Sequence, residues 1–229
     1  MSIIDRHTGR NEFDLIRALP VHPFDYTYLM WVLRSYRSPR DKISRLLKNG
    51  DLLQIKRGLY IPSPKYGGKI EPGVISNLIY GPSYVSLEYA LSFWGLIPER
   101  VHEVTAMTNK RNKYFRTPLG AFSYKYINTA KFSPGVTLVK SEAQSRISGK
   151  QSIFFFIATR EKALCDKLAT VREITGKADI IDYLKFDLRI DPEAITGLNM
   201  QTLKKIGDTY NKKSVTALVD WVAQAKKEP

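Results

Sequence analysis

The stretch that decides the fold of the N-terminal part is SPRDKISRLLKNGDLLQIKRGLYIP, residues 38–62. Ser38 is followed by a proline, and Asp41 comes three residues after Ser38, so the pattern predicts a helix that begins with a capping box. Gly50 predicts the end of this helix. The two apolar runs that follow, DLLQI and LYIP, are short and flank a glycine, and they predict a β-hairpin.

The residues expected on the helix divide into an apolar side and a cationic side. Ile43, Leu46 and Leu47 share one side of a helical wheel, and we expect this side to face the core. The remaining positions and the hairpin tip carry the residues that we expect to contact DNA, which are Arg40, Lys42, Ser44, Arg45, Lys48, Lys56 and Arg57. An ordinary solvated surface is the alternative interpretation of these charges.

The turn of the hairpin is expected at Arg57 and Gly58. A two-residue turn would place Lys56 opposite Leu59, but the apolar pattern also allows a longer turn, so the register stays open. Two helical patterns precede this unit, one at residues 11–18 and one in YTYLMWVLRSY. This order of helices and hairpin is that of a winged helix-turn-helix, whose recognition helix enters the major groove of DNA.

The charge of the whole chain indicates a polyanionic partner. The chain has 229 residues and a formal net charge of +14, which points to nucleic acid or to an anionic membrane surface. Residues 1–70 carry 13 basic and 6 acidic residues, and residues 71–229 carry 23 and 16. The length suits two domains, and the proline- and glycine-rich residues 62–73 are expected to link them. We therefore predict a DNA-binding domain at 1–70 and a second domain at 71–229.

The C-terminal part contains strand-like runs followed by helical ones. VHEVTAM, YFRTPLGAFSYKYI, GVTLVK and SIFFFIA have the length and composition of strands. Four of the later helical patterns follow residues that cap helices well, namely Thr159, Asp191, Asn199 and Ser214. Strands grouped before helices predict an α+β or mixed α/β domain whose sheet is mostly antiparallel.

Several features predict a cytoplasmic protein. No apolar run is long enough to cross a membrane, and the N-terminus lacks the apolar core of a secretion signal. Cys165 is the only cysteine, which excludes an internal disulfide and is typical of a reducing compartment. Its apolar neighbours predict a core position. Trp31 lies in an apolar helical pattern and is also expected to pack inside.

Three stretches resemble a known family. RDKISRLLKNGDLLQIKRGLYIP resembles the N-terminal winged helix of the AbiEi family, antitoxins of abortive-infection, type IV toxin–antitoxin systems. SLEYALSFWGLIP (residues 86–98) and IATREKALCDKL (residues 157–168) are similar to the C-terminal antitoxin domain of that family. Two residues depart from the family pattern. Arg160 stands where the family has proline, and Trp94 stands where it has a histidine or a small polar residue.

The resemblance implies a transcriptional regulator that takes part in phage defence. It implies an N-terminal domain that represses its own operon by binding inverted repeats in its promoter. It also implies a C-terminal domain that relieves the toxicity of a nucleotidyltransferase-like toxin without forming a tight complex with it. Direct binding of the toxin by the C-terminal domain stays open as an alternative.

A second basic region follows in the C-terminal part. The sequence has no acidic residue between Glu103 and Glu142, and its cations there are interleaved with aromatic residues, as in surfaces that bind single-stranded or structured nucleic acid. We therefore expect a second surface there for flanking DNA or for RNA. The expected second basic surface comprises Lys110, Arg111, Lys113, Arg116 and Lys125. The alternative is an amphipathic hairpin, because FSYKYI alternates as a strand with one packed side does.

Motifs of catalysis and of cofactor binding are missing from the sequence. The three histidines have no metal-ligand spacing, and neither a phosphate-binding glycine loop nor a nucleophile elbow is present. The pairs Glu161-Lys162 and Asp166-Lys167 are expected to be solvated or salt-bridged. We therefore expect no enzymatic activity, no metal and no cofactor. A metal-dependent nuclease is the remaining alternative, and magnesium-dependent cleavage would reveal it.

Overall fold

The computed structural model describes residues 12–67, 70–145, 149–171 and 176–226. The chain divides into two compact units, Met1–Glu71 with Ser141–Ile153, and Pro72–Lys140 with Phe154–Pro229. Eleven α-helices and two β-sheets in the described residues make this a mixed α/β protein, as the sequence predicts. None of the helices in these residues is long and apolar enough to cross a membrane.

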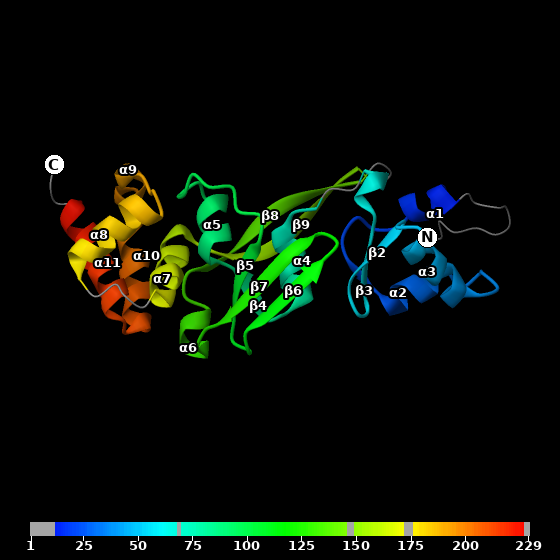
Figure 1. Cartoon of the computed structure of the whole chain (residues 1–229), viewed down its shortest axis with the longest axis horizontal. Helices are drawn as coiled ribbons and strands as arrows, with labels where there is room; N and C mark the ends of the chain where they lie inside the picture. Colours follow the sequence, from blue (N-terminus) through cyan, green and yellow to red (C-terminus); the bar gives the residue numbers. More distant parts are fainter. Residues whose placement is uncertain (1–11, 68–69, 146–148, 172–175, 227–229) are drawn as a thin grey trace. The chain divides into compact units, whose positions relative to one another are not determined.

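The first unit combines three helices with a small sheet. Its elements are α1 (Glu12–Arg17), β1 (Phe24–Asp25), α2 (Tyr26–Val32), α3 (Pro39–Lys48), β2 (Leu52–Lys56), β3 (Leu59–Pro62) and the 3-10 turn η1 (Pro64–Tyr66) (Figure 1). The strands lie in the order β1-β3-β2, and both pairings are antiparallel. The two-residue strand β1 was not predicted, because a single pair of residues leaves no alternation to recognise.

Helix α3 begins and ends where the sequence predicts. Ser38 is its N-cap residue, but the Ser38 side chain makes no capping hydrogen bond, so the predicted capping box is wrong in that respect. At the other end Gly50, with φ of 66°, donates from its N–H to the Leu47 carbonyl at 3.1 Å. The N–H of Asp51 donates to the Leu46 carbonyl at 2.9 Å. These two bonds form a Schellman motif, which needs a left-handed residue at the glycine position.

The hairpin after α3 has a two-residue turn, which is the shorter of the two turns that the sequence allowed. Lys56 pairs with Leu59, while Gln54 pairs with Tyr60, so the register shifts at the residue between Gln54 and Lys56. That residue, Ile55, is a β-bulge, and it is buried like Tyr60. The extra residue lets both apolar side chains pack inside although the turn has only two residues.

The residues expected to be a linker are in part folded onto the first unit. Tyr66 donates from its hydroxyl to Asp51 at 2.5 Å, and Lys65 forms an ion pair with the same carboxylate at 2.5 Å. The N–H of Ser63 donates to the Asp51 carbonyl at 2.9 Å. The expectation of an open linker from residue 62 is therefore wrong for η1, because Asp51 provides it with three attachments.

The second unit contains a six-stranded sheet and the remaining helices. Its strands are β4 (Ser83–Val85), β5 (Val104–Thr108), β6 (Lys113–Thr117), β7 (Gly120–Tyr126), β8 (Val136–Ser145) and β9 (Gly149–Ala158). Its helices are α4 (Pro72–Ile79), α5 (Leu87–Phe93), α6 (Thr129–Phe132), α7 (Arg160–Thr170), α8 (Lys177–Asp182), the π-helical η2 (Tyr183–Asp187), α9 (Pro192–Thr196), α10 (Met200–Tyr210) and α11 (Lys213–Ala225). Residues 141–153, at the adjoining ends of β8 and β9, are grouped with the first unit.

The sheet of the second unit contains both antiparallel and parallel pairs. Its strand order is β6-β7-β5-β4-β9-β8. The pairs β4–β9 and β5–β7 are parallel, whereas β4–β5 and β6–β7 are antiparallel. The antiparallel pairs β4–β5 and β6–β7 agree with the expectation of a largely antiparallel sheet. The parallel pair β5–β7 was not predicted, and it arises because β6 lies at the edge and brings β7 back parallel to β5.

The C-terminal helices gather beside α7 at one end of the second unit (Figure 1). Thr159, Asp191 and Asn199 each accept a backbone hydrogen bond in the first turn of α7, α9 and α10, which confirms three predicted caps. Ser214 is not a cap. Helix α11 begins two residues earlier than predicted, at Lys213, and the buried Ser214 hydroxyl donates to the Leu168 carbonyl at 3.1 Å.

Candidate nucleic-acid interface

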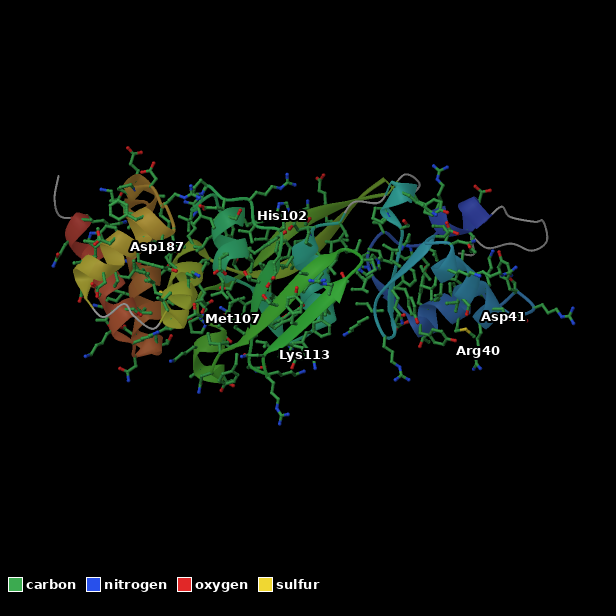
Figure 2. All side chains as sticks on the ribbon, in the orientation of Figure 1. Arg40, Asp41, His102, Met107, Lys113 and Asp187 are labelled. Atoms are coloured by element: carbon green, nitrogen blue, oxygen red, sulfur yellow. The ribbon has the colours of Figure 1, made fainter. Side chains whose placement is uncertain are left out.

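Helix α3 presents its cationic residues on the side opposite to the core. Ile43 and Leu46 are buried, and Leu47 packs against the same cluster, as the helical wheel predicts. Four of the predicted DNA contacts on α3 are exposed, namely Arg40, Ser44, Arg45 and Lys48. Arg40 lies beside Asp41 on the first turn (Figure 2). The amphipathic sequence thus orients the charges through the burial of its apolar side.

The charged side chains on this surface keep their hydrogen-bonding capacity. Arg40, Arg45 and Lys48 form no side-chain hydrogen bond or ion pair with any residue that the structure describes. Lys42 differs, because it is half-buried and its ammonium lies 5.7 Å from the Tyr36 ring centroid. Ser44 donates to the Arg40 carbonyl at 3.1 Å. The two arginines and Lys48 are therefore the residues best placed to bind an external anion.

The hairpin tip adds a further exposed cation to the first unit. Arg57 is exposed in the two-residue turn, and Lys56 is half-buried at the end of β2. Strand β2 contacts α3 directly. All seven predicted DNA contacts therefore lie in one unit, on α3, at the end of β2 and in the turn that follows it.

An exposed tryptophan at the end of α2 was not expected. Trp31 is 53% exposed, so the prediction that it packs inside is wrong. The Arg34 guanidinium carbon lies 4.4 Å from the Trp31 ring centroid, and Arg34 also donates to the Trp31 carbonyl at 2.9 Å. An arginine three residues after a tryptophan at the end of a helical pattern is the sequence signal that could have indicated this stacked pair.

The second basic region divides among three places. Lys110 and Arg111 lie in the loop before β6, where Lys110 donates to the Gly81 carbonyl at 2.6 Å. Lys113 and Arg116 lie on β6, and Lys125 lies on β7. All five side chains are exposed. Figure 2 shows Lys113 at the periphery of the unit, whereas Met107 on β5 lies in its interior.

A buried ion pair in the second unit was missed by the sequence reasoning. Lys162 and Asp166 lie one turn apart on α7, and both side chains are 0% exposed. The ammonium of Lys162 lies 3.4 Å from Oδ1 of Asp166, and it donates to the Tyr210 hydroxyl at 2.6 Å and to the Lys131 carbonyl. These residues were expected to be solvated or salt-bridged; the ion pair confirms the second of these roles, whereas its complete burial was not expected. A lysine and an aspartate spaced i, i+4 among alanine, leucine and cysteine is the signal that could have found the pair.

Asp166 receives hydrogen bonds from three other elements. The Tyr84 hydroxyl donates to its Oδ2 at 3.0 Å and Ser86 donates to the same oxygen at 2.6 Å. The Tyr210 hydroxyl donates to Oδ1. The carboxylate thus connects α7 with β4, with the N-cap of α5 and with the end of α10, and it compensates in this way for the cost of burying the charge.

The ionisation of this network is dominated by burial. Burial lowers the pKa of Lys162, which the charge of Asp166 opposes. Burial raises the pKa of Asp166, against the opposing effects of Lys162 and of the hydrogen bonds from Ser86, Tyr210 and Tyr84. Burial and the charge of Asp166 also raise the pKa of Cys165, whose side chain is buried as predicted. These groups are enclosed by protein, so their arrangement is structural.

A glycine allows the chain to pass close to this network. Gly135 has φ of 78°, and an added Cβ would lie 2.4 Å from Cδ1 of Ile206 and 2.8 Å from Cβ of Lys162. Its carbonyl accepts a hydrogen bond from the N–H of Thr159 at 2.8 Å. Only glycine fits this position without displacing the stem of Lys162.

Metal ligands do not gather in the part of the chain that the structure describes, where no group of three or more histidine, cysteine, aspartate or glutamate side chains could hold a metal ion. Two acidic residues of α7 have structural partners instead. Glu161 accepts a hydrogen bond from the N–H of Asn199 at 2.8 Å, and Asp166 is held in the network described above.

Comparison of the chain with protein-family models and with curated proteins finds no match. The function proposed below therefore rests on the residues and on their placement.

Proposed function

We propose that residues 12–62 form a winged helix-turn-helix that binds duplex DNA. The order α1-β1-α2-α3-β2-β3 supports this proposal, because it supplies a helix pair followed by a hairpin that can touch the backbone beside the major groove. Helix α3 is the recognition helix in this proposal. Its exposed arginines can bind guanine edges or phosphates, and Arg57 at the hairpin tip can bind the adjacent phosphates.

A single observation carries the proposal. Arg45 and Lys48 are exposed on α3 and form no side-chain bond within the described residues, while Ile43 and Leu46 on the opposite side are buried. A helix held in this way loses no internal contact when its cations bind phosphate. The orientation that DNA binding requires is therefore present before DNA arrives.

We further propose that the protein is a cytoplasmic antitoxin and autorepressor of a type IV, AbiE-like toxin–antitoxin system in phage defence. The operator would be inverted repeats in its own promoter, and the second unit would counteract a nucleotidyltransferase-like toxin. Two stretches that resemble the family support this, because residues 86–98 begin at the N-cap of α5 and residues 157–168 contain most of α7. Helices α5 and α7 pack together, and Ser86 donates to Asp166. The resemblance therefore lies in one contiguous region of the core.

We also propose that the protein acts by binding rather than by catalysis. The carboxylates of Glu161 and Asp166 hold other parts of the fold in place, which supports a structural role for the acidic residues of α7. Magnesium-dependent cleavage of DNA or RNA by the purified chain would contradict this part of the proposal.

The DNA-binding proposal is tested by measuring the affinity for a duplex that contains the promoter of the protein's own gene. Substituting Arg45→Gln and Lys48→Gln together should weaken binding at least about tenfold and should derepress a promoter reporter, because two contacts are lost. The matched control is Lys204→Gln with Lys205→Gln, which removes two exposed lysines from α10. Equal losses of affinity in the two double variants would contradict the proposal.

A further inference from the structure

The β6–β7 hairpin has one covered face. Paired residues of antiparallel strands point to the same side of a sheet, and Lys113 pairs with Tyr124 while Phe115 pairs with Phe122. Tyr124 and Phe122 are buried, and the Tyr124 hydroxyl donates to the Ser76 carbonyl of α4 at 2.7 Å. Helix α4 therefore covers this face, and Lys113 lies at its margin.

The opposite face of the same hairpin is exposed at β6, although helix α5 covers the same side of the sheet at β5. Tyr114 pairs with Ser123 on this face, and its side chain is 52% exposed. Arg116 follows two residues after Tyr114 on β6, and Lys125 follows two residues after Ser123 on β7. Because the strands are antiparallel, the two cations lie on opposite sides of the tyrosine ring, each roughly 7 Å along the strand direction from it.

The charge around this face is positive. Arg116 is exposed and forms no side-chain bond with a residue that the structure describes. The acidic group near Lys125 is Glu88, which is already paired with Lys167. Burial of Glu88 opposes ionisation, yet the hydrogen bond from Lys167 and, to a smaller extent, the charge of Lys125 lower its pKa. The face therefore offers cations and a flat ring to an anionic ligand.

We propose that this face, composed of Tyr114, Arg116, Ser123 and Lys125, binds a single-stranded polynucleotide. An exposed tyrosine ring can stack on an unpaired base, and cations on its two sides can bind the flanking phosphates. A duplex fits less well, because its base faces are already stacked on one another. This function differs from duplex binding by α3, uses a different unit of the chain, and does not depend on it.

The test measures binding of the full chain to a short fluorescent oligouridylate and to the corresponding oligothymidylate by fluorescence anisotropy. Tyr114→Ala should weaken binding at least about fivefold, the loss expected for one stacked base, and Tyr114→Phe should keep the wild-type affinity. Arg116→Gln with Lys125→Gln should make the log–log salt slope shallower by about 1.4, because two phosphate contacts are lost.

The hairpin provides matched controls on its other face. Tyr126 is 57% exposed and lies on the same side as Tyr124, and Lys113 is an exposed cation of β6. Tyr126→Ala and Lys113→Gln should therefore leave the affinity unchanged. Equal weakening by the controls and by the Tyr114 and Arg116/Lys125 variants would overturn the proposal, as would a failure of the wild-type chain to bind either oligonucleotide.

Three further measurements distinguish this proposal from other partners and from loss of folding. A saturating promoter duplex should not displace the oligonucleotide, and displacement would place both ligands on one surface and overturn the proposal. Polyglutamate that binds through Arg116 and Lys125 but does not respond to Tyr114→Ala would identify an acidic peptide as the partner instead. A variant whose melting temperature equals that of the wild type has not lost its affinity through unfolding. If Tyr114→Ala does not fold, the single variant Arg116→Gln tests the face in its place.

Discussion

Lys162 and Asp166 bring two ionisable groups wholly inside the second unit, and their partners explain how the fold tolerates them. The carboxylate of Asp166 accepts hydrogen bonds from the hydroxyl groups of Tyr84, Ser86 and Tyr210. The ammonium of Lys162 donates to a carbonyl and to a hydroxyl. These partners offset part of the cost of removing the two charges from water. Loss of either member leaves the other charge unpaired in a medium that solvates it poorly.

Replacing one member of the pair should therefore be costly. Asp166→Asn should lower the free energy of unfolding by about 3–5 kcal/mol, because Lys162 would remain buried without its counter-charge. Urea denaturation followed by circular dichroism measures the change. The double substitution Lys162→Met with Asp166→Leu should cost less than Asp166→Asn alone, since no charge is then left unpaired. A single variant as stable as the wild type would show that the pair is not essential to the fold.

At the scale of elements, the signals that predicted α3 were local. Pro39 stands at the first position of the helix, and Gly50 stands at the position where the Schellman motif needs a left-handed residue. The burial of Ile43 and Leu46 follows from their shared side of the helix. The placement of Arg45 and Lys48 in solvent could therefore be predicted without knowledge of the rest of the chain.

Other elements depend on contacts between distant residues, which the sequence does not display. Strand β4 has three residues, and all of them are buried, so it shows no alternation. Its neighbours β5 and β9 come later in the chain. The burial of Lys162 likewise depends on Tyr210, which lies 48 positions away in the sequence. It could not be inferred from the charged residues of α7 alone. Lys113 and Arg116 are three positions apart and so point to opposite faces of a strand, but only the structure shows which of these faces α4 covers.

An ion pair between two elements makes stability depend on pH. Glu88 on α5 pairs with Lys167 on α7. Burial by itself raises the pKa of Glu88, but the hydrogen bond from Lys167 and the charge of Lys167 lower it below its ordinary value. A carboxyl whose pKa is lower in the folded state stabilises the fold above the unfolded pKa of about 4.3, and this stabilisation is lost as the pH falls through the folded value. At neutral pH the free energy of unfolding of the wild type should therefore be about 1 kcal/mol higher than that of Glu88→Gln.

Thermal unfolding measured over a series of pH values tests this prediction. The difference in stability between the wild type and Glu88→Gln should become steadily smaller as the pH falls below about 4.3. Glu99→Gln is the control, because the ion pair of Glu99 with Arg189 is more exposed and should contribute little. A difference that stays constant down to about pH 3 would show that the carboxylate of Glu88 does not stabilise the fold through its charge.

At the scale of the whole molecule, the chain carries its positive charge in two units that present it differently. Residues 1–70 have an excess of seven basic residues, and so do residues 71–229, although the first stretch is less than half as long. The first unit presents its charge on a helix that suits a groove, and the second presents part of it on a flat sheet face beside an exposed ring. This difference is the basis of the two proposals, which assign duplex DNA to the first surface and a single-stranded polynucleotide to the second.

The salt dependence of duplex binding tests the central claim most directly. If each copy neutralises about five phosphates, the logarithm of the association constant should fall with the logarithm of salt concentration with a slope near −4.5. Substituting Arg45→Gln and Lys48→Gln should make that slope shallower by about 1.8, because two of those contacts are removed. A slope near zero, or the same slope in the wild type and in the double variant, would contradict the assignment of α3 as the DNA-binding helix.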